Sequence, residues 1–174
     1  MRWLIMCAVL CLAACSSVVI ADRPSVEKGA SWIILPFLNH TETPQAGLRA
    51  ESIVENVLHV GGLSSLVRYP SHLVPEETLF ENAERKHLDT TLEWAAKNNF
   101  RYAVVGTVEE WRYKVGVDGE PAVGMGIQIV DVASKKVIWA ASGGETGWSR
   151  EALSAVAHEL VEKLLDPVLI VVKE

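Results

Sequence analysis

Residues 101–142 read RYAVVGTVEEWRYKVGVDGEPAVGMGIQIVDVASKKVIWAAS. Apolar runs separated by turn residues predict three consecutive strands in this stretch, over 101–115, 122–132 and 136–142. Asp118-Gly119 marks the first turn, because Asp-Gly is a strong hairpin signal, and the run 131–135 makes the second. Strands joined by short turns must pair antiparallel. The stretch therefore predicts an antiparallel three-stranded meander.

Two strand-and-helix units precede the meander. Their predicted order is a strand over 31–38, a helix over 46–60, a strand over 65–69 and helical sequence over 76–98. The first helix carries an apolar stripe at helical spacing and stops at Gly61-Gly62. We expect the second to break near His87, with Asp89 able to cap a new segment. Crossover connections of this kind favour parallel strand pairing.

A glycine-rich segment, 143–147, follows the meander and leads to Trp148. Ser149 is a plausible N-cap for a last helix that runs to about Leu165, where Asp166-Pro167 would end it. Residues 169–172 fit either a short strand or a buried tail. The order β-α-β-α-β-β-β-α predicts a single α/β domain, with a mixed sheet of about five strands and helices packed on its faces.

The N-terminus has the features of a bacterial lipoprotein signal. Arg2 precedes an apolar run that is too short to span a membrane, which needs about 20 residues. Leu12-Ala-Ala-Cys15 resembles a lipobox, in which the cysteine thiol accepts a diacylglycerol. We therefore predict a signal peptide over 1–14, lipidation at Cys15, an irregular tether over 15–29 and a periplasmic domain over 30–174. An ordinary secretory signal with an incidental cysteine is the alternative.

The site of anchoring follows from the same segment. Ser16, rather than aspartate, follows the cysteine, which favours the outer membrane with the domain on its periplasmic face. Fully extended, the tether would reach on the order of 40 Å at about 3.3 Å per residue. Cys7 and Cys11 lie within the predicted signal, so the mature chain has no pair of thiols.

Charge and motifs argue against several classes of function. The chain has 16 basic and 22 acidic side chains, and this acidic balance argues against binding to nucleic acid. The five histidines form no H-E-x-x-H motif, and neither a G-x-S-x-G elbow nor a phosphate-binding loop occurs. Glu109 and Glu110 should point to opposite faces of a strand, which would prevent a carboxylate dyad. We expect no catalytic residue, no metal and no cofactor.

Two features have alternative explanations. Trp148 is either a plug for the core or an exposed anchor, since indole favours the interface between membrane and water. Asp118 and Glu120 are either solvated turn residues or part of a repeated acidic site. In a ring of subunits, one acidic tip per subunit would become a ring of carboxylates that attracts a cationic polymer.

The chain resembles the PelC family, outer-membrane lipoproteins of the Pel exopolysaccharide export system that builds biofilm matrix. The matching segments, besides the lipobox, are 32–44, 102–109, 131–139 and 147–149. The resemblance implies a ring-shaped homo-oligomer, expected to be a dodecamer, on the periplasmic face of the outer membrane below the β-barrel PelB. Its acidic pore would guide the cationic polysaccharide to that barrel. Asp118 is the first candidate for the pore acid, Glu120 the second, and Trp148 the candidate membrane contact.

Two other functions remain open, because parts of these segments also occur in related periplasmic lipoproteins. A regulator of a peptidoglycan synthase would act as a monomer on a long disordered tether, and the short tether here counts against it. A curli-type secretion subunit would need membrane-spanning strands of about 9–11 residues. Residues 101–132 are long enough, but the charged run 111–114 fits a soluble sheet better.

Overall fold

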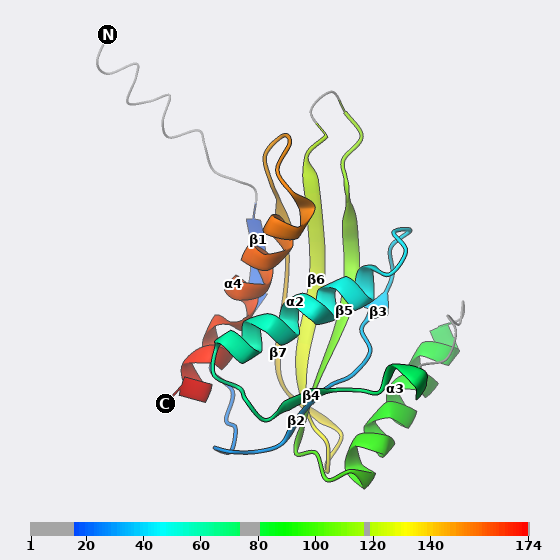
Figure 1. Ribbon diagram of the computed structural model, residues 1–174, viewed down its shortest axis with the longest axis vertical. Coiled ribbons are helices and arrows are strands. Elements are labelled where there is room, and N and C mark those ends of the chain that lie inside the picture. Colours follow the sequence, from blue (N-terminus) through cyan, green and yellow to red (C-terminus); the bar gives the residue numbers. More distant parts are fainter. Residues whose placement is uncertain (1–15, 74–80, 117–118, 174) are drawn as a thin grey trace.

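The computed structural model describes residues 16–73, 81–116 and 119–173, which build a mixed sheet with helices on its faces (Figure 1). The strands are β1 (Ser16–Ile20), β2 (Trp32–Ile34), β3 (Leu38–Asn39), β4 (Leu66–Arg68), β5 (Tyr102–Tyr113), β6 (Pro121–Asp131) and β7 (Lys136–Thr146). The helices are α2 (Ala46–Val60), α3 (Glu81–Lys97), α4 (Leu153–Lys173) and the short 3-10 helix η1 (Ser71–Leu73). The predicted α/β class is confirmed, with seven strands rather than about five.

The sheet order is β1-β7-β6-β5-β2-β4, and β3 also pairs with β5. The meander is confirmed, because β5, β6 and β7 pair antiparallel, while β2 pairs parallel with both β4 and β5. The β5–β6 hairpin extends past the helices at one end of the molecule (Figure 1).

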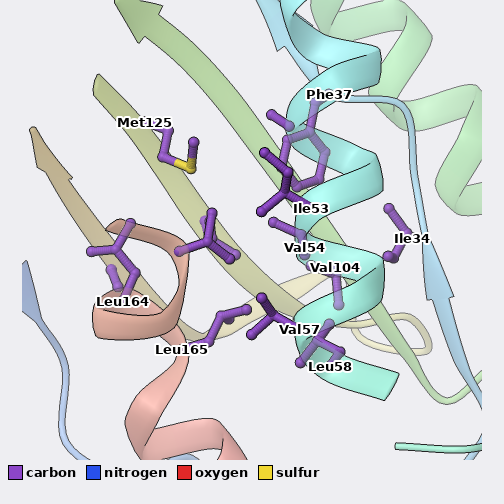
Figure 2. Packing of buried hydrophobic residues seen from close by; sticks show 14 of the residues in the cluster. Ile34, Phe37, Ile53, Val54, Val57, Leu58, Val104, Met125, Leu164 and Leu165 are labelled. Atoms are coloured by element: carbon purple, nitrogen blue, oxygen red, sulfur yellow. The ribbon is translucent and has the colours of Figure 1, made fainter. Parts of the chain in front are cut away.

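Helices α2 and α4 cover one face of the sheet, which we call the helix face. Alternate residues of β6 point into this core, and they meet the apolar stripe predicted for residues 46–60 (Figure 2). These buried side chains include Val123, Met125, Ile127 and Ile129 of β6, and Ala50, Ile53, Val54, Val57 and Leu58 of α2. On the opposite face, Leu92 and Ala95 of α3 pack with Ile33 and Val130 in a smaller cluster.

The first residues of the mature chain differ from the prediction. Instead of an irregular tether from Ser16, residues 16–20 form β1, which pairs antiparallel with β7. Val18, Val19 and Ile20 are β-branched and suit an edge strand. Ile20 packs against the main core, which holds this segment on the sheet. The predicted domain boundaries and the lipidation of Cys15, which lies outside the described residues, stay predictions.

The last helix also differs from the prediction. It begins at Leu153, so Ser149 is not its N-cap, and it continues through Pro167 to Lys173. Residues 169–172 are therefore helical. Leu165 and Val168, on either side of the proline, are buried. Their burial offsets the backbone hydrogen bond that proline removes from a helix interior.

Three boundaries were wrong in smaller ways. The strand predicted over 31–38 is interrupted around Pro36, between β2 and β3, and α3 continues through His87 without a break. Strand β7 runs on to Thr146 and includes Gly143 and Gly144. A Cβ at Gly143 would lie 2.6 Å from Val18 Cγ1 and 3.3 Å from Leu160 Cδ1. Glycine is therefore needed for β1 and α4 to close on this strand.

The buried carboxylate of Glu51, on α2, should make stability depend on pH. Its Oε1 accepts the Phe37 N–H at 3.1 Å, and its Oε2 lies 3.8 Å from Arg68 Nε. Burial raises the pKa of Glu51, and the Phe37 N–H and Arg68 lower it by less. A raised folded-state pKa means that this group's contribution is fully present below about pH 4.5 and is lost as pH rises through the folded-state value.

We therefore expect Glu51→Gln to gain stability relative to the parent chain between pH 4 and pH 7.5, because the amide stays neutral and still accepts the Phe37 N–H. Urea unfolding at several pH values measures this. Glu55→Gln is the matched control, since Glu55 is a more exposed carboxylate of the same helix that lies 3.4 Å from the same arginine. An identical pH dependence in the parent and the Glu51 variant would contradict the expectation.

Candidate functional site

Ser16, Trp148 and Glu120 lie at one end of the sheet. Ser16 pairs with Glu145 of β7, and Glu145 pairs in turn with Val123 of β6, which pairs with Trp111 of β5. Cys15 is bonded to Ser16, and Trp148 follows the last residue of β7 by two positions. The described ends of the β5–β6 hairpin, residues 116 and 119, lie beyond the same level (Figure 1). We call this region, residues 16, 113–116, 119–121 and 146–152, the hairpin end.

Trp148 is exposed and is not a plug for the core, because 57% of its surface is accessible. Its backbone N–H donates to Glu151 Oε2 at 2.8 Å, which ties down the loop between β7 and α4. A Cβ at Gly147 would lie 2.5 Å from Val156 Cγ2 and 2.9 Å from Pro121 Cγ. The glycine therefore lets the loop pack closely on the sheet and the helix, while the indole beside it stays outside.

The predicted turn falls between the end of β5 at Tyr113 and the start of β6 at Pro121, and its residues 117 and 118 lie outside the described residues. The Lys114 N–H donates to the Glu120 carbonyl at 2.7 Å, which extends the ladder beyond β5 and β6. Glu120 is exposed, so its carboxylate faces solvent. Asp118 lies outside the described residues. The pairing across the stem brings Glu120 to the hairpin end, and the pore role of both acids stays a prediction.

A bulge gives the hairpin two more carboxylates on one face. The register between β5 and β6 shifts between Val108 and Glu110. A Cβ at Gly124 would lie 3.3 Å from Glu110 Cβ and 3.9 Å from Glu109 Cβ, so both glutamates leave the strand on the face opposite α2 and α4. The expected alternation is wrong here, because the extra residue of a bulge interrupts it.

The two carboxylates nevertheless bind different partners. Glu109 Oε1 lies 3.0 Å from His40 Nδ1, and Glu110 Oε1 accepts from Arg112 Nε at 2.8 Å. A paired-carboxylate acid–base site is therefore not formed by these two residues. Among the described residues, no group of three or more histidine, cysteine or acidic side chains is placed to hold a metal ion.

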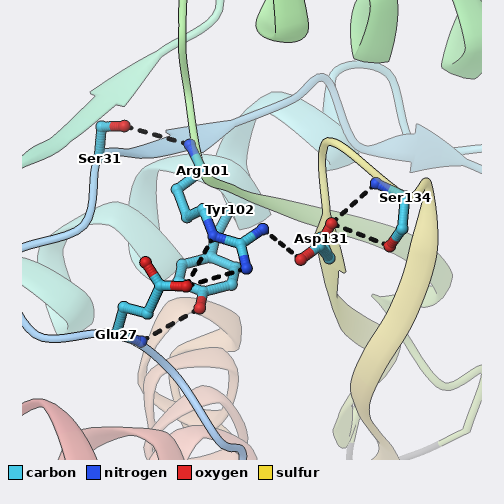
Figure 3. A network of polar contacts seen from close by, with 6 residues as sticks. All are labelled: Glu27, Ser31, Arg101, Tyr102, Asp131 and Ser134. Carbon is cyan, nitrogen blue, oxygen red and sulfur yellow. Dashed lines mark hydrogen bonds and ion pairs between the residues drawn. The ribbon is translucent and has the colours of Figure 1, made fainter.

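A polar network at the other end of the meander holds the N-terminal segment (Figure 3). Arg101 binds both Glu27 and Asp131, and the Tyr102 hydroxyl accepts the Glu27 N–H at 3.1 Å. Hydrogen bonds from Ser134, followed by Arg101, lower the pKa of Asp131, while burial opposes them. The segment that was predicted as a tether is thus fixed twice, at β1 and at Glu27.

Two clefts lie beside the sheet. One, of about 370 Å³, opens on the face opposite α2 and α4 and is lined by residues that include Leu38, Val105 and Ser142. His87 of α3 also lines it, and burial lowers the pKa of this imidazole. The other, of about 550 Å³, lies on the helix face and includes Trp111 and Tyr113. No helix in the described ranges is long and apolar enough to cross a bilayer.

Comparison with solved structures identifies close relatives. The chain is 39% identical to the subunit of a PelC dodecamer from Paraburkholderia phytofirmans, with 89% of this chain and 98% of that chain covered and a TM-score of 0.75. A single-residue variant of that dodecamer, in another crystal form, is also 39% identical, with 87% and 98% coverage and a TM-score of 0.71. No family model and no curated protein matches the chain.

A more distant neighbour shares only the fold. The lipoprotein GNA1162 from Neisseria meningitidis is 18% identical, with 80% of this chain and 97% of that chain covered and a TM-score of 0.54. Identity, coverage and fold agree for the Paraburkholderia protein, and the segments 32–44, 102–109 and 131–139 all lie within the described domain. The chain belongs to the PelC family.

Proposed function

We propose that this protein is a lipid-anchored component of Pel exopolysaccharide export, on the periplasmic face of the outer membrane. It acts without enzymatic chemistry, as a ring that guides a cationic polysaccharide toward the outer-membrane barrel PelB. The observation that supports the proposal is the register of β1, since Ser16 lies opposite Glu145, at the end of the sheet where Trp148 and Glu120 lie. Its relatives in Paraburkholderia form dodecamers, and we propose the same assembly here.

The ring gives the hairpin acids their role. A single exposed carboxylate attracts a cation weakly in water, because solvent and salt screen it. Repetition around a closed ring adds the potentials of all tips in one opening, where low-dielectric walls focus the field. Asp118 and Glu120 would form this acidic opening, and Glu109 and Glu110 would extend it along the same hairpin. A partly deacetylated polysaccharide carries ammonium groups that such an opening attracts.

The fixed N-terminal segment also bears on the alternative functions. A regulator that reaches a peptidoglycan synthase from the outer membrane needs a long free tether. Here β1 begins one residue after Cys15, so the domain sits directly at its anchor. This short connection favours a component that stays at the membrane surface.

Asp118→Asn is the test of the pore. We expect this variant to reduce export of the polysaccharide while the oligomer keeps its size, because the substitution removes one charge and keeps the size of the side chain. Secreted polymer is measured with a lectin or an antibody, and oligomer mass by light scattering. Asp89→Asn, at an exposed position of α3, is the matched control and should export normally. Unchanged export from the Asp118 variant would contradict the proposed pore role.

Trp148→Ala tests the membrane contact. We expect weaker docking to lipid vesicles with stability within about 0.5 kcal/mol of the parent, because the indole is mostly exposed. Vesicle flotation of the chain and thermal unfolding of the domain measure the two quantities. A stability loss of about 3–5 kcal/mol, the cost of truncating a buried aromatic residue, would instead show that Trp148 packs in the core.

A further inference from the structure

The β5–β6 hairpin has two different faces at its tip. Trp111 and Tyr113 lie on the helix face, where they line the cleft beside α2 and α4. Lys114 lies on the opposite face, since its Nζ donates to Thr146 Oγ1 at 2.9 Å. The next residue, Val115, lies at a bend just beyond the strand, near the tip of the hairpin. The Val115 side chain is fully exposed.

The loop that carries Trp148 lies beside Tyr113. It leads from β7 to α4, which packs on the helix face, and it is tied to the hairpin through Tyr113. The Tyr113 hydroxyl accepts the Leu153 N–H at 3.1 Å and donates to the Glu151 carbonyl at 3.3 Å. Half of the tyrosine surface remains exposed. Tyr113, Val115 and Trp148 thus place three exposed apolar side chains at the hairpin end.

The start of the described chain indicates what covers these side chains. Ser16 already pairs with Glu145 of β7, so no flexible segment separates Cys15 from the sheet. A diacylglycerol on Cys15 therefore holds the hairpin end against the bilayer instead of letting the domain swing on a flexible tether. Tyrosine and tryptophan favour the boundary between headgroups and acyl chains, and valine favours the apolar region below it.

We propose that Val115, together with Tyr113 and Trp148, forms an apolar surface that contacts lipid, and that the seating of β1 presses this surface onto the membrane. The opposite face of the hairpin, with Glu110, Lys114 and Glu120, stays in water. The inference rests on the proposed lipid anchoring and adds to it a second insertion point and a defined orientation. The membrane contact is then set by two loops rather than by a single tryptophan.

The cysteine content of the chain allows a direct test. Once Cys15 is acylated and the signal is removed, the mature chain has no free thiol. In the full lipidated chain, Val115→Cys is labelled with an environment-sensitive nitrobenzoxadiazole dye and reconstituted into vesicles of phosphatidylethanolamine and phosphatidylglycerol. The matched control is Val60→Cys, at another highly exposed valine, on the last turn of α2 away from the hairpin.

For the dye at position 115, we expect the fluorescence intensity to rise several-fold, the emission maximum to shift to the blue and brominated lipid to quench the signal. The dye at position 60 should keep the emission of a dye in water. Flotation of the same samples reports anchoring independently. A chain that floats while both dyes report water would overturn the inference and leave the anchoring intact. A chain that does not float would overturn the proposed anchoring, and the inference with it.

A linker variant tests the role of β1. A serine-led Gly/Ser segment of about twelve residues, inserted between Cys15 and Ser16, gives a flexible reach of about 20 Å and keeps serine after the cysteine. We expect flotation to persist and the dye signal at 115 to fall, because the domain is no longer pressed onto the bilayer. A dye signal that the linker leaves unchanged would overturn the role assigned to β1.

Discussion

Leu164→Ala is expected to destabilise the domain by about 2–5 kcal/mol, the usual cost of emptying a fully buried leucine site. Leu164 lies on α4 with no exposed surface, in the cluster that joins α4 to α2 and the sheet (Figure 2). The site is enclosed by several elements and cannot collapse easily, which favours the upper part of the range. Urea or thermal unfolding of the domain from Ser16 onward measures the loss. For a chain of this size, each kcal/mol corresponds to about 2–4 °C in Tm.

The control for this variant is Leu48→Ala, which makes the same truncation at a half-exposed position of α2. Its effect should stay within about 0.5 kcal/mol. Equal losses from the two variants would contradict the packing of α4 against α2 and the sheet.

Cys15→Ser is expected to release the chain from the membrane. A serine hydroxyl does not accept the diacylglycerol, so this variant lacks the predicted lipid anchor. Stable attachment of a peripheral protein needs two lipid chains or a second signal, and the exposed Trp148 alone is a weak one. Membrane fractionation should show the chain moving to the soluble fraction, and mass spectrometry should show the loss of the lipid.

Cys11→Ser is the matched control, since it changes a nearby cysteine inside the predicted signal. It should leave the chain lipidated and in the membrane fraction. Retention of the Cys15 variant in the membrane without any lipid would contradict lipidation as the anchor.

Much of the fold could be predicted because local signals and tertiary packing agree. The helix over 46–60 was predicted with its observed bounds, since its apolar stripe faces the sheet and Gly61 follows it. The meander was predicted because its alternation and turn residues specify the pairing. The misses are places where tertiary contacts outweighed local propensity. Burial of Val168 stabilises the last helix where it continues through Pro167. The free edge of β7 pairs with the uncharged strand β1.

The residues of the candidate site could be predicted one by one, but their proximity in space could not. Sequence indicated Cys15, Trp148 and the hairpin acids separately, and only the strand registers show that Ser16, Trp148 and Glu120 share one end. The second carboxylate on the hairpin face was missed, because a bulge at Glu109 and Glu110 leaves no clear local signal. Val115 was missed too, since a lone valine in a turn gains meaning only from its neighbours in space.

Assembly of the subunits into a ring connects these features. In a monomer, one hairpin with a few acids would attract a cation only weakly. One lipid with one tryptophan would bind the membrane only weakly. Under the proposed function, repetition around a ring would focus the potential of the acids and would give the anchors a continuous contact with the membrane. The 39% identity to a PelC dodecamer, over 98% of that chain, supports this assembly.

The mass of the purified domain, from Ser16 onward, in light scattering tests the ring most directly. The account predicts a single discrete oligomer of about twelve protomer masses, as in the Paraburkholderia dodecamer, at a size that does not change with dilution. A monomer, both in solution and when the full lipidated chain is measured in detergent, would contradict it.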